Sequence, residues 1–333
     1  MSQKPKSGFI TGNLCILVAT IFWGINVAVT KALIPDWMTS YGISAVRLVG
    51  GCILMWIASI FVKCVKIERQ DWIKLILGGA VGLFLFIFLF VKSLSYGSPI
   101  DISIIMTLPP VFVIIIGVIF QKQRPALIEY IGCLVSFIGA AIVILAEGKS
   151  SGGSDKLLGD VLAIASTICY AFYLVILEKP THTYKPINML RWVFLFAAIP
   201  ALFLIPGMQK EPIVHTKEVV PWVEIAFILV CVTFLAYFLV QPAIKRIGSE
   251  LVSLYQYLLP VFATIASVSM GLDKLKWIQV VAMLIIIFGM VLTNIGKRKR
   301  AQKELAAQAQ TASDSVTPTA DGTNSSSENA QKN

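Results

Sequence analysis

The stretch IKLILGGAVGLFLFIFLFV, residues 73–91, decides the fold class of this chain. It contains a single charged residue, Lys74, and it is as long as a helix needs to be to cross the hydrocarbon of a bilayer, roughly 17 to 25 residues. A membrane-spanning β-strand would show alternating polarity over about ten residues instead. The run therefore predicts a transmembrane helix, which satisfies its own backbone hydrogen bonds in lipid.

Similar apolar blocks fill most of the chain. They run near 13–34, 40–62, 73–91, 100–120, 126–146, 157–177, 189–206, 221–240, 250–270 and 276–295. Hydrophobic residues make up 57% of the sequence and charged residues 14%, whereas a typical soluble protein has about 25% charged residues. We therefore predict an all-α integral membrane protein with about ten transmembrane helices.

The positions of lysine and arginine predict the orientation of the chain. Loops rich in these residues face the cytoplasm. Seventeen of them flank the predicted helices on the side of the two termini, and eight lie on the opposite side. We expect a multi-pass protein of the inner (plasma) membrane with both termini cytoplasmic. The net charge of +10 is then a topology signal, and nucleic acid is not an expected partner.

Two segments of similar sequence indicate an internal repeat. Residues 109–120 read PPVFVIIIGVIF, and residues 259–270, at an offset of 150, read LPVFATIASVSM. The tripeptide YGS at 96–98 corresponds to IGS at 247–249. The chain is thus predicted to contain two copies of a five-helix unit.

An odd number of helices in each copy has a geometric consequence. The second copy begins on the opposite side of the membrane, so the two halves are inverted repeats. Secondary transporters are commonly built this way, with the substrate site near the midplane, although some channels also are. The predicted units are a first repeat with a short cytoplasmic N-terminus (1–146), a periplasmic linker (147–156), a second repeat (157–296), and a basic anchor with a disordered cytoplasmic tail (297–333).

Several short motifs carry a family resemblance. They are FWGIN at 22–26, Arg47, the YGSP turn at 96–99, PVF at 110–112 and the pattern GxxxxxxGA from Gly132 to Ala140. Together they resemble the EamA family of the drug/metabolite transporter superfamily, over about residues 10–296. The resemblance implies transport of a small metabolite, with export as the expected direction. One departure is the stretch QKQ at 121–123, where an acidic residue is common; the second copy keeps Asp273.

Polar and aromatic residues in the middle of apolar blocks are the candidate substrate-binding residues. Trp23 and Asn26 lie in the first helix, and Tyr170 and Tyr173 occupy the equivalent places in the second copy. Tryptophan and tyrosine normally favour the membrane interfaces, so their position at mid-depth predicts a polar cavity with aromatic walls. Packing of aromatic rings between helices is the alternative interpretation.

Two further candidates precede the aligned prolines. Thr107 lies ahead of Pro110, and Tyr257 lies ahead of Pro260. A proline inside a helix removes a backbone hydrogen bond and frees a carbonyl, which could then face a cavity. A plain structural kink would explain the same pattern.

Arg47 and Arg191 are the basic residues placed well inside apolar blocks. A charge at membrane depth usually faces protein or water and often serves function. We expect Arg47 to contact substrate; the alternatives are snorkelling from a helix end or a structural hydrogen-bond role.

Other function classes lack their sequence signals. No paired carboxylates occur at mid-depth, no nucleotide-binding GxxxxGK loop is present, and the six cysteines form no CxxC pair. The sequence predicts no catalytic residue, cofactor or metal. The preferred function is therefore a secondary transporter for an amino-acid-like or amphipathic solute, working by alternating access and not as an enzyme. A receptor, a structural subunit or a lipid-group transferase are the alternatives.

Overall fold

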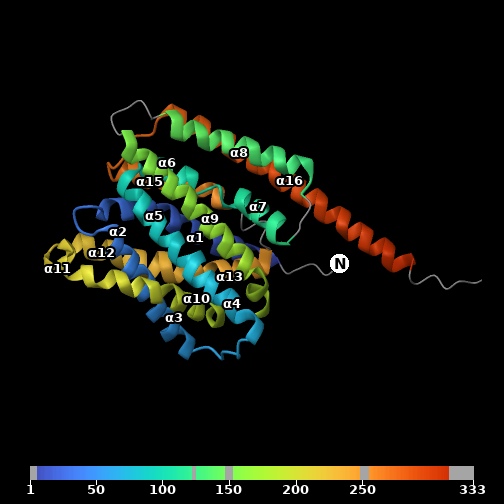
Figure 1. Ribbon diagram of the computed structural model, residues 1–333, viewed down its shortest axis with the longest axis horizontal. Coiled ribbons are helices and arrows are strands. Elements are labelled where there is room, and N and C mark those ends of the chain that lie inside the picture. The colour runs from blue at the N-terminus through green and yellow to red at the C-terminus, as the bar shows by residue number, and fades with distance from the viewer. Residues whose placement is uncertain (1–5, 122–124, 147–152, 248–254, 315–333) are drawn as a thin grey trace, which may run out of the picture.

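The computed structural model describes residues 6–121, 125–146, 153–247 and 255–314 (Figure 1). These residues form helices joined by short connections, and none of them lies in a β-strand. The prediction of an all-α protein is confirmed. Residues 147–152 of the predicted linker and residues 315–333 of the predicted tail lie outside the described residues.

The first half of the chain contains eight α-helices interrupted by two π-helical segments, η1 and η2. In chain order they are α1 (Lys6–Leu33), α2 (Ser40–Ala45), η1 (Val46–Gly50), α3 (Gly51–Ile60), α4 (Arg69–Leu77), η2 (Gly78–Leu83), α5 (Phe84–Tyr96), α6 (Pro99–Ile105), α7 (Pro109–Gln121) and α8 (Leu127–Ala146).

The described part of the second half contains one π-helical segment, η4, and two 3-10 segments, η3 and η5. Its described elements are α9 (Gly153–Thr183), α10 (Pro186–Ala201), η3 (Leu202–Lys210), α11 (Pro212–His215), α12 (Val219–Phe227), η4 (Ile228–Leu235), α13 (Ala236–Ile247), η5 (Gln256–Leu258), α15 (Leu259–Ser269) and α16 (Trp277–Asp314).

Eight helical stretches among the described residues are long and apolar enough to cross a membrane. They are Phe9–Leu33, Ser40–Ile60, Arg69–Tyr96, Pro99–Ile119, Asp155–Thr181, Pro186–Lys210, Val220–Ala243 and Trp277–Gly296. Two shorter apolar helices, Leu127–Ile142 and Leu259–Ser269, fall where the remaining two spans are predicted. At about 1.5 Å per residue, the 11 residues of Leu259–Ser269 are too short for the roughly 30 Å of hydrocarbon, whereas the full α8, with 20 residues, is about long enough. The multi-pass helical fold is confirmed, and the count of ten spans stays a prediction.

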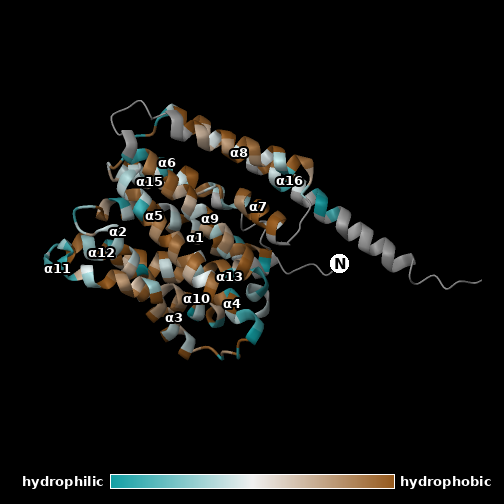
Figure 2. Cartoon of the chain, in the orientation of Figure 1, coloured by the Kyte–Doolittle hydropathy of each residue, from teal (hydrophilic) through white to brown (hydrophobic). Residues whose placement is uncertain are grey.

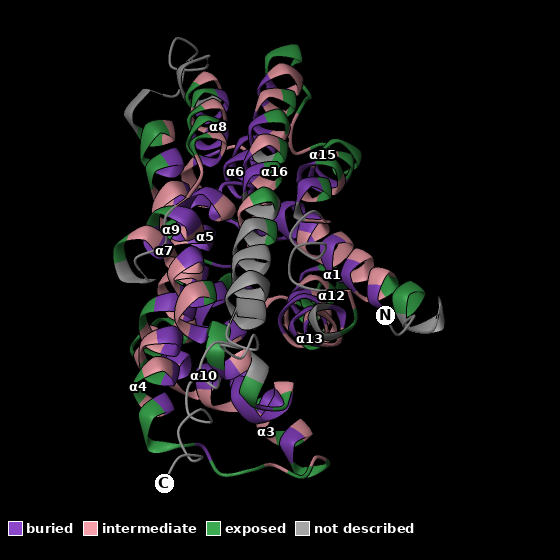
Figure 3. Ribbon diagram, turned by 90° about the vertical axis from the view of Figure 1, so that its right-hand side faces the viewer, coloured by how far each residue is buried: buried purple, intermediate pink, exposed green. Residues whose placement is uncertain are grey.

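The surface of the bundle is apolar where that of a soluble protein would be polar. Phe61, Phe203 and Trp277 are each at least 80% exposed, and brown, hydrophobic residues line the outer sides of the long helices (Figure 2). The buried residues face inward between the helices (Figure 3), and they include polar ones such as Asn26 and Arg47. This inside-out distribution fits a bilayer as the solvent.

Helices α8 and α16 lie side by side along one edge of the molecule (Figure 1). They run antiparallel, because Gly132 near the start of α8 meets Thr293, and Gly139 further along meets Ile286. A Cβ atom on Gly132 would collide with the carbonyl oxygen of Gly289. Small residues allow this close approach of two backbones, as in other membrane helix pairs.

The first turns of these two helices are capped in the same way. The backbone N–H of Ala126 donates to Oε1 of Glu129 over 2.9 Å, and the N–H of Lys276 donates to Oε1 of Gln279 over 2.8 Å. The two pairs are separated by the offset of 150 residues that relates the repeats. A side-chain acceptor at this place satisfies an N–H that the helix itself leaves without a partner.

Helix α16 continues beyond the membrane span, through the basic cluster that begins at Lys297, as far as Asp314. The composition of this region predicts a disordered tail, yet the residues described there, as far as Asp314, are helical. Alanine, glutamine, lysine and glutamate, which dominate 301–310, are strong helix formers. Arg300 on this extension lies 3.5 Å from the carboxylate of Glu129 on α8.

Candidate functional site

A cavity of about 60 Å³ lies inside the bundle, between elements of both repeats. Six of the elements that enclose it are α1, η1, α5, α7, α9 and α13. Its lining residues are Trp23, Asn26, Val27, Arg47, Phe86, Phe90, Met106, Pro109, Tyr170, Tyr237 and Leu259. Space of this size holds several ordered waters when polar groups are present to bind them. We call it the central cavity.

Four of the seven predicted binding residues line the central cavity. They are Trp23, Asn26, Arg47 and Tyr170. These positions span 147 residues of sequence, and the packing of α9 against α5, together with that of α1 against α13 and α15, brings them together. The close approach of α1 to α15 depends on Gly24, where a Cβ would come within 2.5 Å of the Cβ of Phe262.

The other three predicted residues do not belong to the lining. Tyr173 is buried behind Tyr170, with its ring stacked at 5.9 Å between centroids. Thr107 donates its hydroxyl to the carbonyl of Ile104 over 2.7 Å and is buried. The hydroxyl of Tyr257 accepts a hydrogen bond from Nδ2 of Asn294 on α16 over 2.8 Å.

Arg47 brings a charge into the interior of the bundle. Its side chain is 3% exposed. Its Nε donates to the hydroxyl of Thr233 over 3.3 Å, while its Nη1 has no hydrogen-bond partner among the described residues. None of the described residues that line the cavity is acidic. A buried cation without a paired anion is costly, so the cavity is suited to a ligand that brings negative charge.

Aromatic rings frame the rest of the central cavity. Trp23 meets Tyr237 edge-on at 5.9 Å, and Phe86 stacks on Tyr170 at 4.6 Å with an angle of 30°. Asn26 adds an amide whose Oδ1 accepts from the hydroxyl of Thr30 over 3.1 Å. The walls thus combine flat apolar surfaces with a few fixed polar groups, as ligand pockets generally do.

Phe86, Phe90 and Tyr237 are lining residues that are not predicted from the sequence. A phenylalanine in a phenylalanine-rich run carries no distinct signal. The internal repeat does carry a signal, because the offset of 151 that relates YGS at 96–98 to IGS at 247–249 also relates Phe86 to Tyr237. Applied along these helices, it would have paired the two residues as equivalent wall positions.

The π-helical segments lie next to the cavity residues. Arg47 is in η1 and Thr233 is in η4, so the hydrogen bond between them joins two such segments. Shifted by the same 151 residues, η2 falls on η4, and Gly82 corresponds to Thr233. A Cβ on Gly82 would come within 2.9 Å of the Cβ of Tyr173. Local π-helix is frequent at functional sites, because the extra residue redirects side chains.

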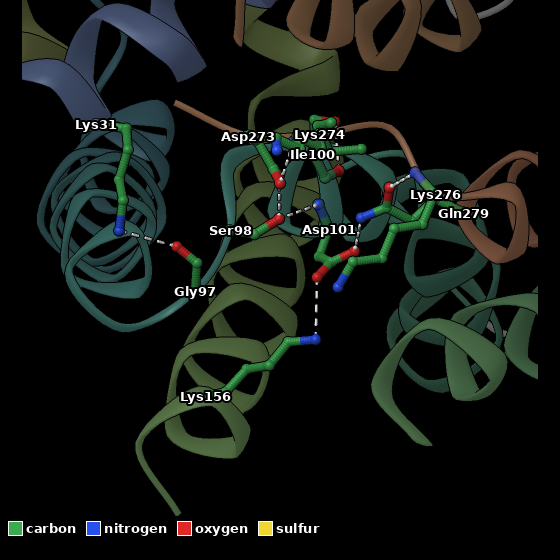
Figure 4. A network of polar contacts seen from close by, with 11 residues as sticks. Lys31, Gly97, Ser98, Ile100, Asp101, Lys156, Asp273, Lys274, Lys276 and Gln279 are labelled. Atoms are coloured by element: carbon green, nitrogen blue, oxygen red, sulfur yellow. Dashed lines mark hydrogen bonds and ion pairs between the residues drawn. The ribbon is translucent and has the colours of Figure 1, made fainter. Parts of the chain in front are cut away.

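One end of the bundle is closed by a network of polar contacts (Figure 4). The ammonium of Lys31, at the end of α1, donates to the carbonyls of Leu94 and Gly97 over 2.7 and 3.1 Å. The hydroxyl of Ser98 donates to Oδ2 of Asp273 over 2.6 Å. These contacts tie α1, the turn before α6 and the segment after α15 together.

The same network contains a buried carboxylate. Asp101 on α6 is fully buried; its Oδ1 accepts from Nε2 of Gln279 over 2.7 Å, and its Oδ2 lies 3.0 Å from the ammonium of Lys156 on α9 (Figure 4). Lys31, Lys156 and Lys276 all belong to the set that the charge distribution predicts to be periplasmic. That they gather at one end agrees with the predicted threading of the helices.

The described residues offer no metal site: no group of three or more His, Cys, Asp and Glu side chains could hold an ion. The six cysteines are all free, and each is buried or half-buried. They act as packing residues, in keeping with their position inside apolar helices.

The bundle and its central cavity define a multi-pass helical membrane protein with an enclosed internal cavity. The chain belongs to the EamA-like transporter family, whose model matches twice, over residues 10–145 and 157–295. The double match corresponds to the two predicted repeats.

Curated relatives carry transporter names. Uncharacterized transporter YyaM of Bacillus subtilis (strain 168) is 27% identical over 289 residues, covering 85% of this chain and 93% of that protein. Uncharacterized transporter YvbV of the same organism is 23% identical and covers 92% and 97%. A solved crystal structure, 18% identical, superposes with a TM-score of 0.58 over 89% of this chain and 99% of its own, which shows a shared fold.

Proposed function

We propose that this protein is a secondary transporter that moves a small, amphipathic organic solute with an acidic group across the inner membrane. The observation that carries the proposal is the central cavity, in which the guanidinium of Arg47 meets aromatic walls. Arginine binds carboxylates through two parallel hydrogen bonds. Nη1 of Arg47 keeps its hydrogen-bonding capacity, since no described residue uses it.

The transport mode follows from symmetry. Trp23 and Tyr170, at an offset of 147, and Phe86 and Tyr237, at an offset of 151, are equivalent positions of the two repeats that share one cavity. The antiparallel packing of α8 and α16 supports an inverted arrangement. Two inverted halves that rock against each other open the same site first to one side and then to the other.

The driving force is assigned to solute gradients. A carboxylate proton relay would need an Asp or Glu on the cavity wall, and the described lining has none. The proposed direction is export, which follows from the family resemblance. With both termini in the cytoplasm, the network around Lys31 and Asp273 is the periplasmic closure in this conformation.

The experiment begins with a thermal-shift screen of the purified full chain against carboxylates, amines and neutral metabolites. Solutes that raise the melting temperature are then tested for flux in proteoliposomes. We expect stabilisation and counterflow with amphipathic carboxylates. A protein that binds solutes but shows no flux in any gradient is a receptor or a structural subunit, and the proposal would be abandoned.

A further inference from the structure

A second hollow lies on the outside of the bundle, between α3 and α10. It has a volume of about 660 Å³, and its lining includes Ile53, Trp56, Ile57, Ser59, Ile60 and Arg191. The three isoleucines are 49 to 78% exposed and belong to a predicted membrane span. The hollow therefore opens toward lipid, and we call it the lateral groove.

Arg191 is the cation of the lateral groove. Its Cζ lies 5.2 Å from the ring centroid of Trp56 and 5.3 Å from that of Trp192. Such cation–π contacts orient a guanidinium and leave its in-plane N–H groups available. Among the described residues no carboxylate forms an ion pair with Arg191, and its Nε has no hydrogen-bond partner.

The groove offers a further unsatisfied donor. The indole Nε1 of Trp56 is also buried without a partner in the described part of the chain. Buried donors are nearly always paired in native proteins, and in lipid the loss of a partner is more costly still. These two atoms are enclosed by the protein, so it is the rest of the Arg191 guanidinium, set in an apolar wall, that favours an occupant with both acceptor oxygens and hydrocarbon.

The surroundings favour negative charge on that occupant. The connection between α3 and α4 carries Lys63 and Lys66, and Lys185 precedes α10; all three are exposed. This connection is held over the start of α10, where Nδ2 of Asn188 donates to the carbonyl of Val65 over 2.8 Å. The buried carboxylate of Asp71, in α4, is already paired with Lys74 and with the hydroxyl of Tyr184.

We infer that the lateral groove binds an anionic phospholipid. The headgroup phosphate accepts hydrogen bonds from Arg191, and one acyl chain lies along Ile53 and Ile57 of α3. A basic pocket between membrane helices on the cytoplasmic side is suited to an anionic headgroup. The site is separate from the central cavity, so the inference does not depend on what the protein transports.

The test uses the delipidated full chain in detergent, with native mass spectrometry and thermal unfolding. Phosphatidylglycerol should be retained and should raise the melting temperature, and phosphatidylcholine should do so much less. Arg191→Gln should reduce retention of phosphatidylglycerol about tenfold. The matched control is Arg246→Gln, which removes an exposed cation from the same predicted side and should leave retention unchanged.

Three outcomes would overturn the inference. Equal retention of the two lipids would remove the need for an anionic headgroup, and equal loss in both variants would indicate surface attraction only. Stabilisation by inorganic phosphate alone would mean that a free anion is the ligand. If Arg191→Gln does not fold, a photoactivatable phosphatidylglycerol is used on the unaltered chain. Its labels should fall within 53–60 and 191–195, and labels elsewhere contradict the site.

Discussion

Nε of Arg47 lies 3.3 Å from the hydroxyl of Thr233, and this contact joins residues 186 positions apart in the sequence. The hydroxyl of Thr233 in turn donates to the carbonyl of Ile228 over 2.8 Å. The guanidinium is thus held from one side by the second repeat, while its Nη1 is left without a partner among the described residues. A cation fixed in this way is oriented before any ligand arrives, which reduces the entropy that binding has to overcome.

Replacing Arg47 tests this role. Arg47→Gln should lower solute flux about tenfold to a hundredfold, because a hydrogen bond to a charged group contributes about 1.5–3 kcal/mol. Expression and melting temperature should stay close to those of the unaltered chain, because the variant no longer buries a charge. Arg47→Lys, which keeps the charge but not the fork of donors, should recover part of the flux. A variant that does not accumulate in the membrane would make Arg47 a structural residue.

Thiol labelling tests the lining of the central cavity. On a background without the six native cysteines, single cysteines at 26, 86 and 237 should react with a small membrane-impermeant reagent, and a transported solute should protect them. Cysteines at 107 and 257 should react slowly in the conformation described, since Thr107 and Tyr257 are absent from the lining. Uniform labelling of all five positions, or of none, would contradict the assignment of the cavity.

Reporter fusions test the orientation. Fusions after Gly152 and after Lys303 should give opposite activities, with Gly152 periplasmic, because eight lysines lie on its side of the membrane against seventeen lysines and arginines on the other. Identical activities at both sites would mean that the number of spans between them is even. The prediction of five helices in each repeat would then be wrong.

Packing between α8 and α16 can be tested at a glycine. Gly132→Ala should lower the free energy of unfolding by about 1–3 kcal/mol, the usual cost of overpacking, because the added Cβ meets the backbone of Gly289. Gly207→Ala is the matched control, because a Cβ there has no neighbour within 4 Å and the change should stay within about 0.5 kcal/mol. Equal effects in thermal unfolding would mean that the two helices are not in close contact.

The buried carboxylate of the polar network is expected to stabilise the fold. Asp101→Ala removes the partner of Lys156 and Gln279, and breaking a buried pair from one side typically costs about 3–5 kcal/mol. Asp155→Ala, at an exposed position in the first turn of α9, should cost about 1 kcal/mol or less. Denaturant unfolding of both variants in the same detergent measures the difference; a small effect at Asp101 would show that the pair is solvated.

The helical fold and part of the cavity could be predicted from the sequence for physical reasons. A membrane helix needs a long apolar run, and such runs are visible without any structure. Trp23, Asn26 and Arg47 stand out because polar or amphipathic groups at mid-depth need partners. All three line the central cavity, and their role in binding stays a prediction.

The rest depends on local backbone geometry that the sequence does not display. The prolines that follow Thr107 and Tyr257 predict a cavity position for both side chains, yet neither lines the central cavity. The helix is interrupted between α6 and α7, where Thr107 lies, and Tyr257 lies in the 3-10 segment η5. The α-helical period therefore does not give the direction of the side chains of Thr107 and Tyr257. The contact between Arg47 and Thr233 could not be predicted from the sequence either, because both residues lie in π-helical segments, η1 and η4, which shift the helical register.

These π-helical segments allow motion of a particular kind. A segment that returns to α-helical geometry releases its extra residue, and the helix that follows turns by one residue, about 100° around its own axis. Phe86 lies in the first turn of α5, after η2, and Tyr237 lies in the first turn of α13, after η4. Such a relaxation would exchange the i→i+5 hydrogen bonds of the segment for i→i+4 bonds and would turn the aromatic ring away from the cavity wall. The width of the central cavity could thereby change when one π-helical segment relaxes, and η2 and η4 could relax one after the other.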